Sequence, residues 1–329
     1  MRKRHIIMRA AIVMLILALV LVILYSASKI IGSIVTPKTQ APDDLASSKT
    51  IEIDGIEYFP RQDVSVFMLM GIDRTGPVSA SASYNNRGET DMVALTVFDE
   101  TAKSYKVLML NRDTMLDMPV IGVSGLQAGT TYGQLALSHA YGSGLEDSCE
   151  NTKKAVSDLL HGIEIDYYMS MNMDSVSILN DAVGGVKVNV TDDFSAVDPT
   201  IPMGETVLNG KQAFNFVQNR KGVGDEMNVS RMNRQKEYMN GFVTALGTSV
   251  ESNDAFVVET FEQLSDYIVT DCSVNTLNTM MNRYSEYTFE DIITPEGESI
   301  KGDKYMEFHI DKTSLDKLVL DLFYSEKNI

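Results

Sequence analysis

The spacing of hydrophobic and polar residues changes several times along the chain. Apolar residues are continuous over 10–25, and further on short apolar runs of strand length alternate with amphipathic segments of helical period. This alternation predicts an α/β fold in which helices cover a central mixed β-sheet. Strands are predicted within 51–59 and at 64–70, 92–98, 105–110, 166–171, 186–190 and 306–310, and helices at 174–183, 209–217, 230–246, 274–284 and 314–323, with one or two more between 131 and 161, the clearer at 151–160.

The first apolar run has the length of a membrane span. A spanning helix needs about 20 predominantly apolar residues, and the stretch 6–31 provides them. Basic residues precede it, so the N-terminus is expected in the cytoplasm and the rest outside. A cleaved signal peptide is the alternative, because Ser26-Ala27-Ser28 loosely fits a cleavage site, yet its apolar region usually has about 7–15 residues. We therefore predict a single-pass protein of the cell membrane, with a cytoplasmic tail and transmembrane anchor at 1–32.

Turn and cap residues mark the boundaries that follow the anchor. Asp54-Gly55 between alternating apolar positions predicts a β-hairpin. Gly184-Gly185 is expected to end one helix, and Ser230 is expected to be the N-cap of another. The exported part is expected to consist of a linker at 33–49, a β-hairpin lead-in at 50–63 and one extracytoplasmic domain at 64–329, whose motifs lie in 64–247 and whose last part, 248–329, is less clearly patterned.

Charge is distributed unevenly along the chain. The whole chain has 28 basic and 45 acidic residues, but the first 38 residues hold six of the basic ones and no acid, which leaves a net charge of −23 on the remainder. Nucleic-acid binding rests largely on phosphate neutralisation, so a domain this acidic is not expected to bind nucleic acid. The exported Cys149 and Cys272 could form a disulfide, but two buried free thiols are favoured.

Arginine placement is the most informative chemical feature. Guanidinium is the preferred group for bidentate phosphate contacts, and ligands of open α/β sheets lie beyond the carboxyl ends of strands. Pairing with the abundant acids is the alternative, but the grouping favours an anion site. Six of the eight exported arginines lie at predicted strand ends or around 218–235: Arg74, Arg87, Arg112, Arg220, Arg231 and Arg234.

Two aspartates and one helix face are expected to contribute to the same site as these arginines. Asp73 ends one predicted strand and Asp91 opens the next, and two carboxylates with phosphate oxygens and water suit Mg²⁺; a helix cap or a surface ion pair is the alternative for each. Arg231, Arg234 and Gln235 share one face at a helix N-terminus, where the dipole and free N–H groups favour an anion.

Two further side chains are given structural roles. Asp113 directly follows Arg112 and is expected to orient it. His139 invites a catalytic role, but no serine or cysteine nucleophile motif accompanies it and Gly-x-Ser-x-Gly is absent. Four scattered histidines and no Cys/His cluster also argue against a zinc site. We therefore interpret His139 as structural.

With these motifs in order, the chain resembles the LytR-CpsA-Psr family of cell-wall glycopolymer ligases. Any single motif is weak, but eight in the family's order over residues 64–247, after an N-terminal anchor, are specific. They are Phe67-Met-Leu-Met-Gly-Ile-Asp-Arg74, Thr90-Asp-Met-Val93, Asn111-Arg-Asp-Thr114, His139-Ala-Tyr-Gly142, Ile165-Asp-Tyr-Tyr168, Asp181-Ala-Val-Gly-Gly-Val186, Leu208-Asn-Gly-Lys-Gln-Ala213 and Ser230-Arg-Met-Asn-Arg-Gln235.

The resemblance implies a function and a set of site residues. The family's enzymes transfer a teichoic acid, capsule or secondary wall polymer from a polyprenyl-pyrophosphate carrier in the membrane lipid to peptidoglycan, which implies a Gram-positive envelope. Catalysis would rest on Asp73, Asp91 and Arg112, and an apolar pocket would enclose the prenyl chain. The two aspartates would hold Mg²⁺. The pyrophosphate would be contacted by Arg112, Arg220 and Arg231, together with Gln235. Arg74 and Arg87 lie in the same motifs.

Three departures from the family's pattern bear on activity. Gln218-Asn219-Arg220 stands where members often have Arg-x-Arg, Leu116 stands where a second basic residue often follows, and Arg87-Gly-Glu-Thr-Asp91 is two residues longer than usual. A lost charged hydrogen bond costs roughly 1.5–3 kcal/mol. A non-catalytic membrane-anchored protein that binds lipid pyrophosphate or regulates the envelope is therefore the alternative. A third option is hydrolysis of the pyrophosphate, alone or as a side activity.

Overall fold

The computed structural model describes residues 50–82, 86–122, 125–253, 256–272, 276, 279–280, 283–284 and 286–326. The predicted anchor and linker, and most of the predicted helix at 274–284, lie outside these residues. Within the described part, no helix combines the length and apolar character needed to cross a membrane.

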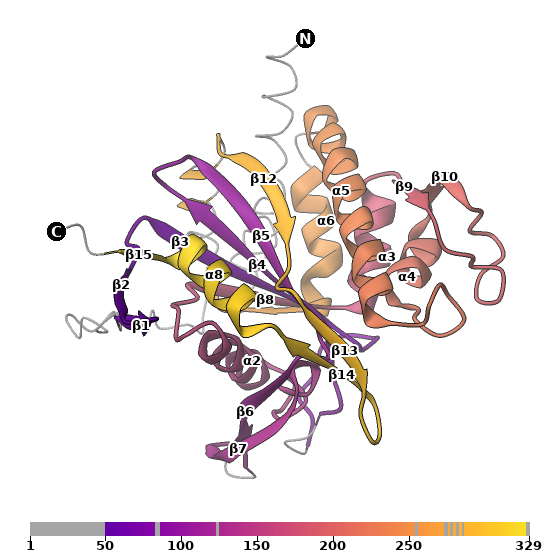
Figure 1. Cartoon of the computed structure of the whole chain (residues 1–329). Helices are drawn as coiled ribbons and strands as arrows, with labels where there is room; N and C mark the ends of the chain where they lie inside the picture. The colour runs from indigo at the N-terminus through magenta and orange to yellow at the C-terminus, as the bar shows by residue number, and fades with distance from the viewer. Residues whose placement is uncertain are drawn as a thin grey trace.

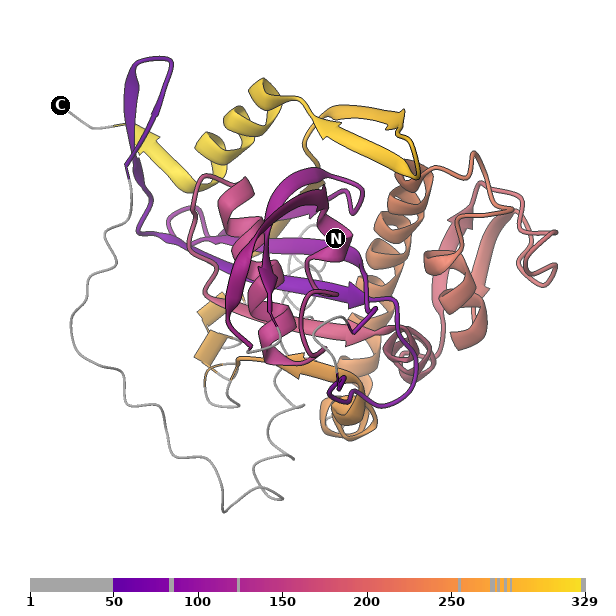
Figure 2. The ribbon, with the colours of Figure 1, turned by 90° about the horizontal axis from the view of Figure 1, so that it is seen from below.

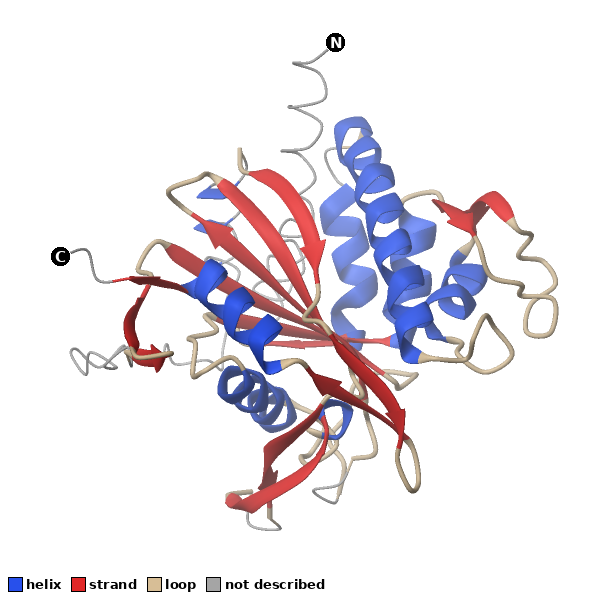
Figure 3. Cartoon of the chain, in the orientation of Figure 1, coloured by secondary structure: helices blue, strands red, loops and turns tan. Residues whose placement is uncertain are grey.

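A six-stranded mixed sheet forms the centre of the domain (Figures 1 and 3). Three neighbouring strands pair antiparallel, and β8 (Tyr167–Asn172) and β12 (Thr288–Ile293) join them in parallel at either side. The predicted central mixed sheet is confirmed. The strand order is β11 (Ile268–Thr270), β8 (Tyr167–Asn172), β3 (Val64–Ile72), β4 (Thr90–Asp99), β5 (Ser104–Leu110) and β12 (Thr288–Ile293).

Alternate residues of the central strands face two separate cores. Phe67 packs with the helices on one face, while Val66 and Met68 pack with those on the other, as the two-residue period of a strand requires. Both faces are therefore covered by helices. The first core includes α3 (Met173–Ala182), α4 (Gly210–Gln218), α5 (Asn228–Ser252) and α6 (Phe256–Leu264), and the second includes α2 (Glu146–Leu159) and α8 (Lys312–Phe323).

Four small sheets surround this centre. The predicted hairpin of β1 (Ile51–Ile53) and β2 (Ile56–Pro60) is confirmed, with Asp54 and Gly55 both at positive φ. The C-terminal β15 (Tyr324–Glu326) pairs with β2, so the last part of the chain belongs to the same domain. The other three are β6 (Met115–Ile121) with β7 (Gln127–Gln134), β9 (Val186–Val190) with β10 (Gly204–Leu208), and β13 (Gly297–Lys301) with β14 (Met306–Ile310).

The predictions for the end of α3 and for the cysteines are confirmed, and the prediction for the start of α5 is wrong. Gly184 and Gly185, at positive φ, follow the end of α3 as expected, and both cysteines are buried and free. The N-cap prediction was wrong: α5 begins two residues before Ser230, with Met227 at the cap. The reason is Asp225, whose carboxylate accepts hydrogen bonds from the Met227 amide and the Ser230 side chain and so stabilises an earlier turn.

Candidate functional site

Strand register brings the first two site residues together. β3 and β4 pair Gly71 with Met92 and Ile72 with Thr90, so Asp91 is the extra residue of a β-bulge. Such bulges re-aim a side chain and are frequent next to active sites. β4 and β5 pair Val93 with Leu110, and the same antiparallel register continued by two residues places Arg112 beside Asp91.

Asp91 is the centre of a buried ion-pair network. Its side chain is 7% exposed; Oδ1 accepts from the Arg112 guanidinium and Oδ2 accepts from Arg231 at 2.9 Å. The second amino group of Arg112 donates to Glu89. Asn228, at the start of α5, accepts from Arg231 at 3.0 and 2.5 Å and fixes its guanidinium in this position. Three segments distant in sequence therefore meet at one carboxylate.

Asp113 and Arg220 extend this network on one side. Asp113 lies 3.6 Å from the Arg112 Nε and 3.6 Å from an amino group of Arg220. Gln134 donates to Asp113 at 2.9 Å. Asp113 therefore has the orienting position expected for it. We call Glu89, Asp91, Arg112, Asp113, Arg220 and Arg231 the arginine–aspartate cluster.

The two buried arginines of this cluster differ in how well the protein stabilises their charges. Burial opposes the charged form of Arg112, but the attraction of Asp91 and Glu89 outweighs it and raises the pKa of Arg112. Burial lowers the pKa of Arg231, and the attraction of Asp91 opposes this effect. Repulsion from Arg112 lowers the pKa further, so the pKa of Arg231 stays below its ordinary value. Because a guanidinium stays protonated at neutral pH, Arg231 carries a positive charge that a bound anion would stabilise.

Asp73 lies at the rim of the site and is exposed to solvent. Its Oδ1 accepts a hydrogen bond from Gln218 Nε2 at 3.1 Å. Gln218 also lines a cavity that Asp91 borders, so it connects Asp73 to the edge of that cavity. Gln218, the residue that departs from the family's pattern, is therefore in contact with a predicted site residue.

Three of the predicted arginines lie apart from the cluster. Arg234 is 4% exposed, but it pairs with Asp192 at 2.6 Å and donates to the carbonyl groups of Phe216 and Asn219. These bonds fix the segment that carries Gln218 and Arg220, so its role here is positional. Arg74 and Arg87 are both exposed, and the ion pairs recorded among the described residues do not include them.

His139 has the structural role predicted for it. Its ring is 2% exposed, and Nδ1 lies 3.0 Å from the Gly88 carbonyl oxygen. Burial lowers the pKa of His139 to about 4, so the ring is neutral at pH 7. Asn86 adds a hydrogen bond of 2.7 Å to the His139 carbonyl. Together these contacts hold the turn that presents Glu89 to Arg112.

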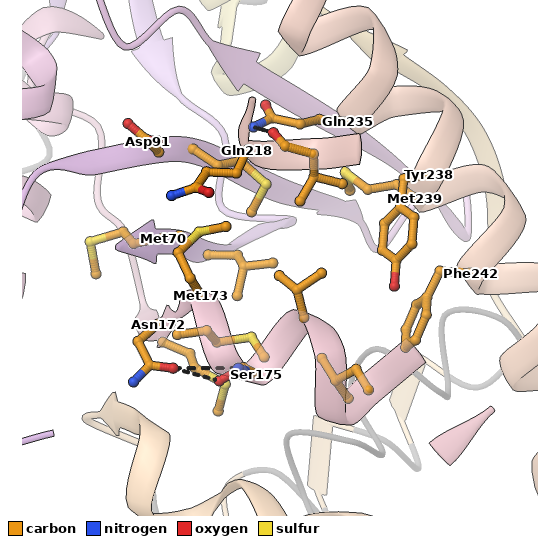
Figure 4. A pocket seen from close by; sticks show the side chains of 18 of the residues that line it. Met70, Asp91, Asn172, Met173, Ser175, Gln218, Gln235, Tyr238, Met239 and Phe242 are labelled. Atoms are coloured by element: carbon orange, nitrogen blue, oxygen red, sulfur yellow. Dashed lines mark hydrogen bonds between the residues drawn. The ribbon is translucent and has the colours of Figure 1, made fainter. Parts of the chain in front are cut away.

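An apolar cavity adjoins the cluster on the helical side (Figure 4). It has an empty volume of about 1090 Å³ including its mouth, and lies between the ends of β3, β4 and β8 and the helices α3 and α5. Asp91 and Gln218 lie at one end and Phe242 at the other (Figure 4). Its methionines, which are flexible and adapt to varied apolar ligands, are Met70, Met92, Met169, Met171, Met173 and Met239.

Gln235 joins the cluster to this apolar cavity. It lines the cavity, and its Nε2 donates to the Val217 carbonyl at 3.2 Å. Its buried Oε1 has no hydrogen-bond partner among the described residues. Tyr238, one turn further along α5, lines the same cavity.

The carboxylates suit a magnesium ion that arrives with a phosphate. In the part of the chain that the structure describes, no three His, Cys, Asp or Glu side chains form a metal-binding group. Mg²⁺ often takes only one or two protein carboxylates and completes its shell with substrate phosphates and water. Asp73 has an oxygen that no recorded hydrogen bond occupies, whereas both oxygens of Asp91 contact arginines. Asp73 could therefore bind a cation directly, whereas Asp91 would have to exchange an arginine contact for the ion.

Comparison with known proteins decides the family. The model of the LytR_cpsA_psr family matches residues 32–322. The chain belongs to the LytR_cpsA_psr family. The family predicted from the eight motifs is thus confirmed, and the match extends beyond residue 247 into the part of the sequence that was less clearly patterned.

Relatives with assigned names are teichoic acid transferases. The polyisoprenyl-teichoic acid–peptidoglycan teichoic acid transferase TagV of Bacillus subtilis (strain 168) is 28% identical over 251 residues, which cover 72% of this chain and 60% of TagV. The corresponding transferase TagU of Bacillus licheniformis is 23% identical over 278 residues, which cover 84% and 82%. The chain thus matches less than two thirds of the length of TagV and most of TagU.

Solved structures share the fold. Gbs0355 of Streptococcus agalactiae superposes with a TM-score of 0.63 at 22% identity, over 79% of this chain and 87% of that one. Bacillus subtilis TagV gives 0.59 at 22% identity, over 80% and 96%. A structure described as TagT bound to LI-WTA gives 0.58 at 21% identity, over 79% and 90%. At these identities the likeness establishes the architecture.

Sequence reasoning missed two members of the site. Glu89 was not singled out, although it shares a turn with Arg87 and pairs with Arg112. Asn228 was placed before the helix, yet it begins α5, fixes Arg231 and donates to Asn111 at 2.5 Å. The spacing of Glu89 and Asp91, two residues apart on an extended segment and therefore on one side, was the available signal.

Proposed function

We propose that this protein is a phosphotransferase that moves a glycopolymer from a polyprenyl-pyrophosphate carrier to peptidoglycan. One observation carries the proposal: buried arginines converge on Asp91, and Asp91 also borders an apolar cavity. A pyrophosphate with a prenyl tail needs this combination of a charged end and an apolar enclosure. The names of the relatives support the same activity.

The cluster would bind the pyrophosphate through its guanidinium groups. Arg112, Arg220 and Arg231 are already balanced by Glu89, Asp91 and Asp113. Each phosphorus of a pyrophosphate with two substituents carries one ionised oxygen, so bound substrate makes the site more negative. A divalent cation that arrives with the substrate would offset this charge, and we propose Mg²⁺ between Asp73 and Asp91.

Catalysis would then consist of positioning and charge stabilisation. An acceptor hydroxyl attacks the sugar-proximal phosphorus, and the bond from that phosphorus to the prenyl phosphate breaks. Arg112 and Arg231 cannot rotate freely, because Asp91, Glu89 and Asn228 hold them. They would therefore face the developing charge without reorganisation. When bound, Mg²⁺ would neutralise the leaving prenyl phosphate.

We further propose that the domain lies outside the cell and is held there by the apolar segment within residues 1–32. An apolar cavity suits the prenyl chain of a carrier that resides in a membrane. An anchor within 1–32 would keep the Arg112 site near the lipid surface, where the carrier's pyrophosphate is found, and within reach of peptidoglycan.

A binding or regulatory protein is the second candidate, and Gln218 favours it. A glutamine there donates one neutral hydrogen bond to Asp73 where family members often have an arginine. Leu116 gives this candidate no support, because its side chain is 6% exposed and packs in the second core.

One assay separates these activities. The full-length protein in detergent would be given a prenyl-pyrophosphoryl disaccharide and peptidoglycan, with and without EDTA, and the products identified by mass spectrometry. Transfer predicts glycan-linked peptidoglycan and free prenyl phosphate, both lost with EDTA. Free phosphorylated glycan in the presence of acceptor would instead indicate hydrolysis. Donor that stays bound and intact with Mg²⁺ present would refute the enzyme and favour the binding protein.

A further inference from the structure

A second, polar cavity borders the arginine–aspartate cluster. It has an empty volume of about 1090 Å³ including its mouth, and it shares Glu89, Arg112, Asp113 and Arg220 with the cluster. Its other wall comes from the turn between β13 and β14 and from Lys221. We call it the lysine cavity. The apolar cavity, by contrast, borders the cluster at Asp91, so the cluster contributes to both.

The lysine cavity has a fixed wall. The Phe308 amide donates to the Asp113 carbonyl at 2.9 Å, and Thr114 forms a parallel bridge with Phe308. Gln134 Nε2 donates to the Asp113 carboxylate at 2.9 Å and to the Met306 carbonyl at 2.8 Å. The hairpin of β13 and β14 is thus tethered to the loop that carries Arg112. Figures 1 and 2 show this yellow hairpin reaching toward α5.

Cations without recorded ion pairs surround this cavity. Lys221, Lys301 and Lys304 line it and are exposed, and the ion pairs found among the described residues use none of them. That is unexpected beside a domain of net charge −23, where acidic partners are abundant. Asp303 is the acidic residue of the turn, so its charge is outweighed. The cavity therefore favours an anionic ligand.

An aromatic ring lies among these lysines. Tyr305 is 43% exposed and lines the same cavity. An exposed tyrosine offers an apolar ring face together with a polar hydroxyl, which suits the apolar face and the hydroxyl groups of a sugar ring. Lysine ammonium groups act as mobile point charges that bind phosphate without fixed geometry. The combination matches a glycan that carries phosphate groups.

We infer that Lys221, Lys301 and Lys304 form a subsite for the phosphate groups of the donor's glycan. The inference rests on the proposed function, because it assigns one end of the same substrate. A prenyl chain in the apolar cavity and a pyrophosphate at Arg112 leave the glycan on the other side of the cluster, where the lysine cavity opens. The substrate class is thus an anionic glycopolymer with phosphate in its repeats.

The test compares two synthetic donors on the full-length protein without acceptor. Both carry the same prenyl pyrophosphate and disaccharide, and one also carries a single glycerol phosphate. Calorimetric titration should show that the phosphate-bearing donor binds about tenfold more tightly, since exposed ion pairs contribute modestly and two or three act together. Lys301→Gln/Lys304→Gln should abolish that preference, and Lys301→Arg/Lys304→Arg should retain it. Raising the salt concentration should weaken it.

Exposed lysines outside the cavity provide the matched control. Lys312→Gln/Lys317→Gln removes two exposed lysines of α8 outside the cavity and should leave the preference intact. A preference that survives Lys301→Gln/Lys304→Gln would overturn the subsite. If the same variant instead weakens binding of a muramic-acid glycan, the lysines serve the acceptor's carboxylate and the assignment to the donor is wrong. If the protein binds the phosphate-bearing donor more tightly but transfers no polymer, the proposed function is refuted and the subsite is retained.

Discussion

The two cavities that meet at the arginine–aspartate cluster are lined by opposite chemistry. The apolar cavity is lined by strand ends and helix faces, including Met169, Met173 and Phe242. The lysine cavity is lined by turns and loops, including Lys301 and Lys304. Core packing thus builds the apolar side, where side chains are held from several directions. The polar side depends on a few hydrogen bonds that tether surface segments, such as those of Gln134.

This contrast indicates which side of the site can vary with the substrate. Strand and helix positions that bury an apolar wall also fix the fold, so this side is constrained by stability. Surface turns carry less of the stability and can exchange charged residues freely. We therefore expect the apolar side to tolerate little change and the polar side to set which polymer is carried.

The largest effect is expected at Asp91, the residue between the two sides. Asp91→Asn removes the charge that offsets Arg112 and Arg231, and breaking a buried ion pair in this way costs about 3–5 kcal/mol. Thermal unfolding should show a clear fall in Tm, and polymer transfer should fall at least about 100-fold.

Asp73→Asn is the matched control for that change. Asp73 is exposed and accepts one hydrogen bond, from Gln218. The Tm of the Asp73→Asn variant should therefore equal that of the unaltered protein, while polymer transfer is lost. Equal Tm values for the two variants would show that the Asp91 network does not stabilise the fold. The ion pairs of Asp91 would then not be what holds the two cavities apart.

A second effect concerns pH and His139, which holds the turn next to Glu89 of the lysine cavity. Burial lowers the pKa of His139 from 6.5 to about 4, so the unfolded state takes up a proton first as the pH falls. Stability that is complete above pH 6.5 should therefore decline by about 3 kcal/mol as the pH falls toward 4. Urea unfolding across this range measures it, with His139→Gln as the variant that lacks this contribution.

The pattern of the sequence specified one cavity far better than the other. Strands at 64–70, 92–98 and 105–110 were predictable because two faces bury apolar residues, and the antiparallel register then dictates that Asp91 meets Arg112. The role of Arg234 was not predictable, because its partner Asp192 depends on how a separate loop packs. Of the hairpin beside the polar cavity, β14 was predicted at 306–310 but its partner β13 was not, and the position of the hairpin depends on Phe308 meeting Asp113.

A third effect tests the apolar side directly. Val243 lines the apolar cavity, and Val243→Trp should fill part of it. Because each buried methylene contributes about 0.8 kcal/mol, a long-chain donor should lose at least about tenfold in affinity, whereas a donor with one isoprene unit should lose little. Thr244→Trp, on the exposed side of α5, is the control. Equal losses for both donors would mean that the prenyl chain lies elsewhere.

The smallest effect is expected at Gln218, which lines the apolar cavity and contacts Asp73. Gln218→Arg replaces one neutral hydrogen bond to exposed Asp73 with an ion pair and adds a guanidinium near the pyrophosphate. Exposed pairs contribute up to about 1 kcal/mol, so the KM for the donor should fall by up to about fivefold. Asn240→Arg adds the same charge on the exposed face of α5 and should leave KM unchanged. A rise in KM would indicate that the new arginine competes for Asp73 with the cation that the substrate brings, which would place Gln218 at the metal rather than at the phosphate.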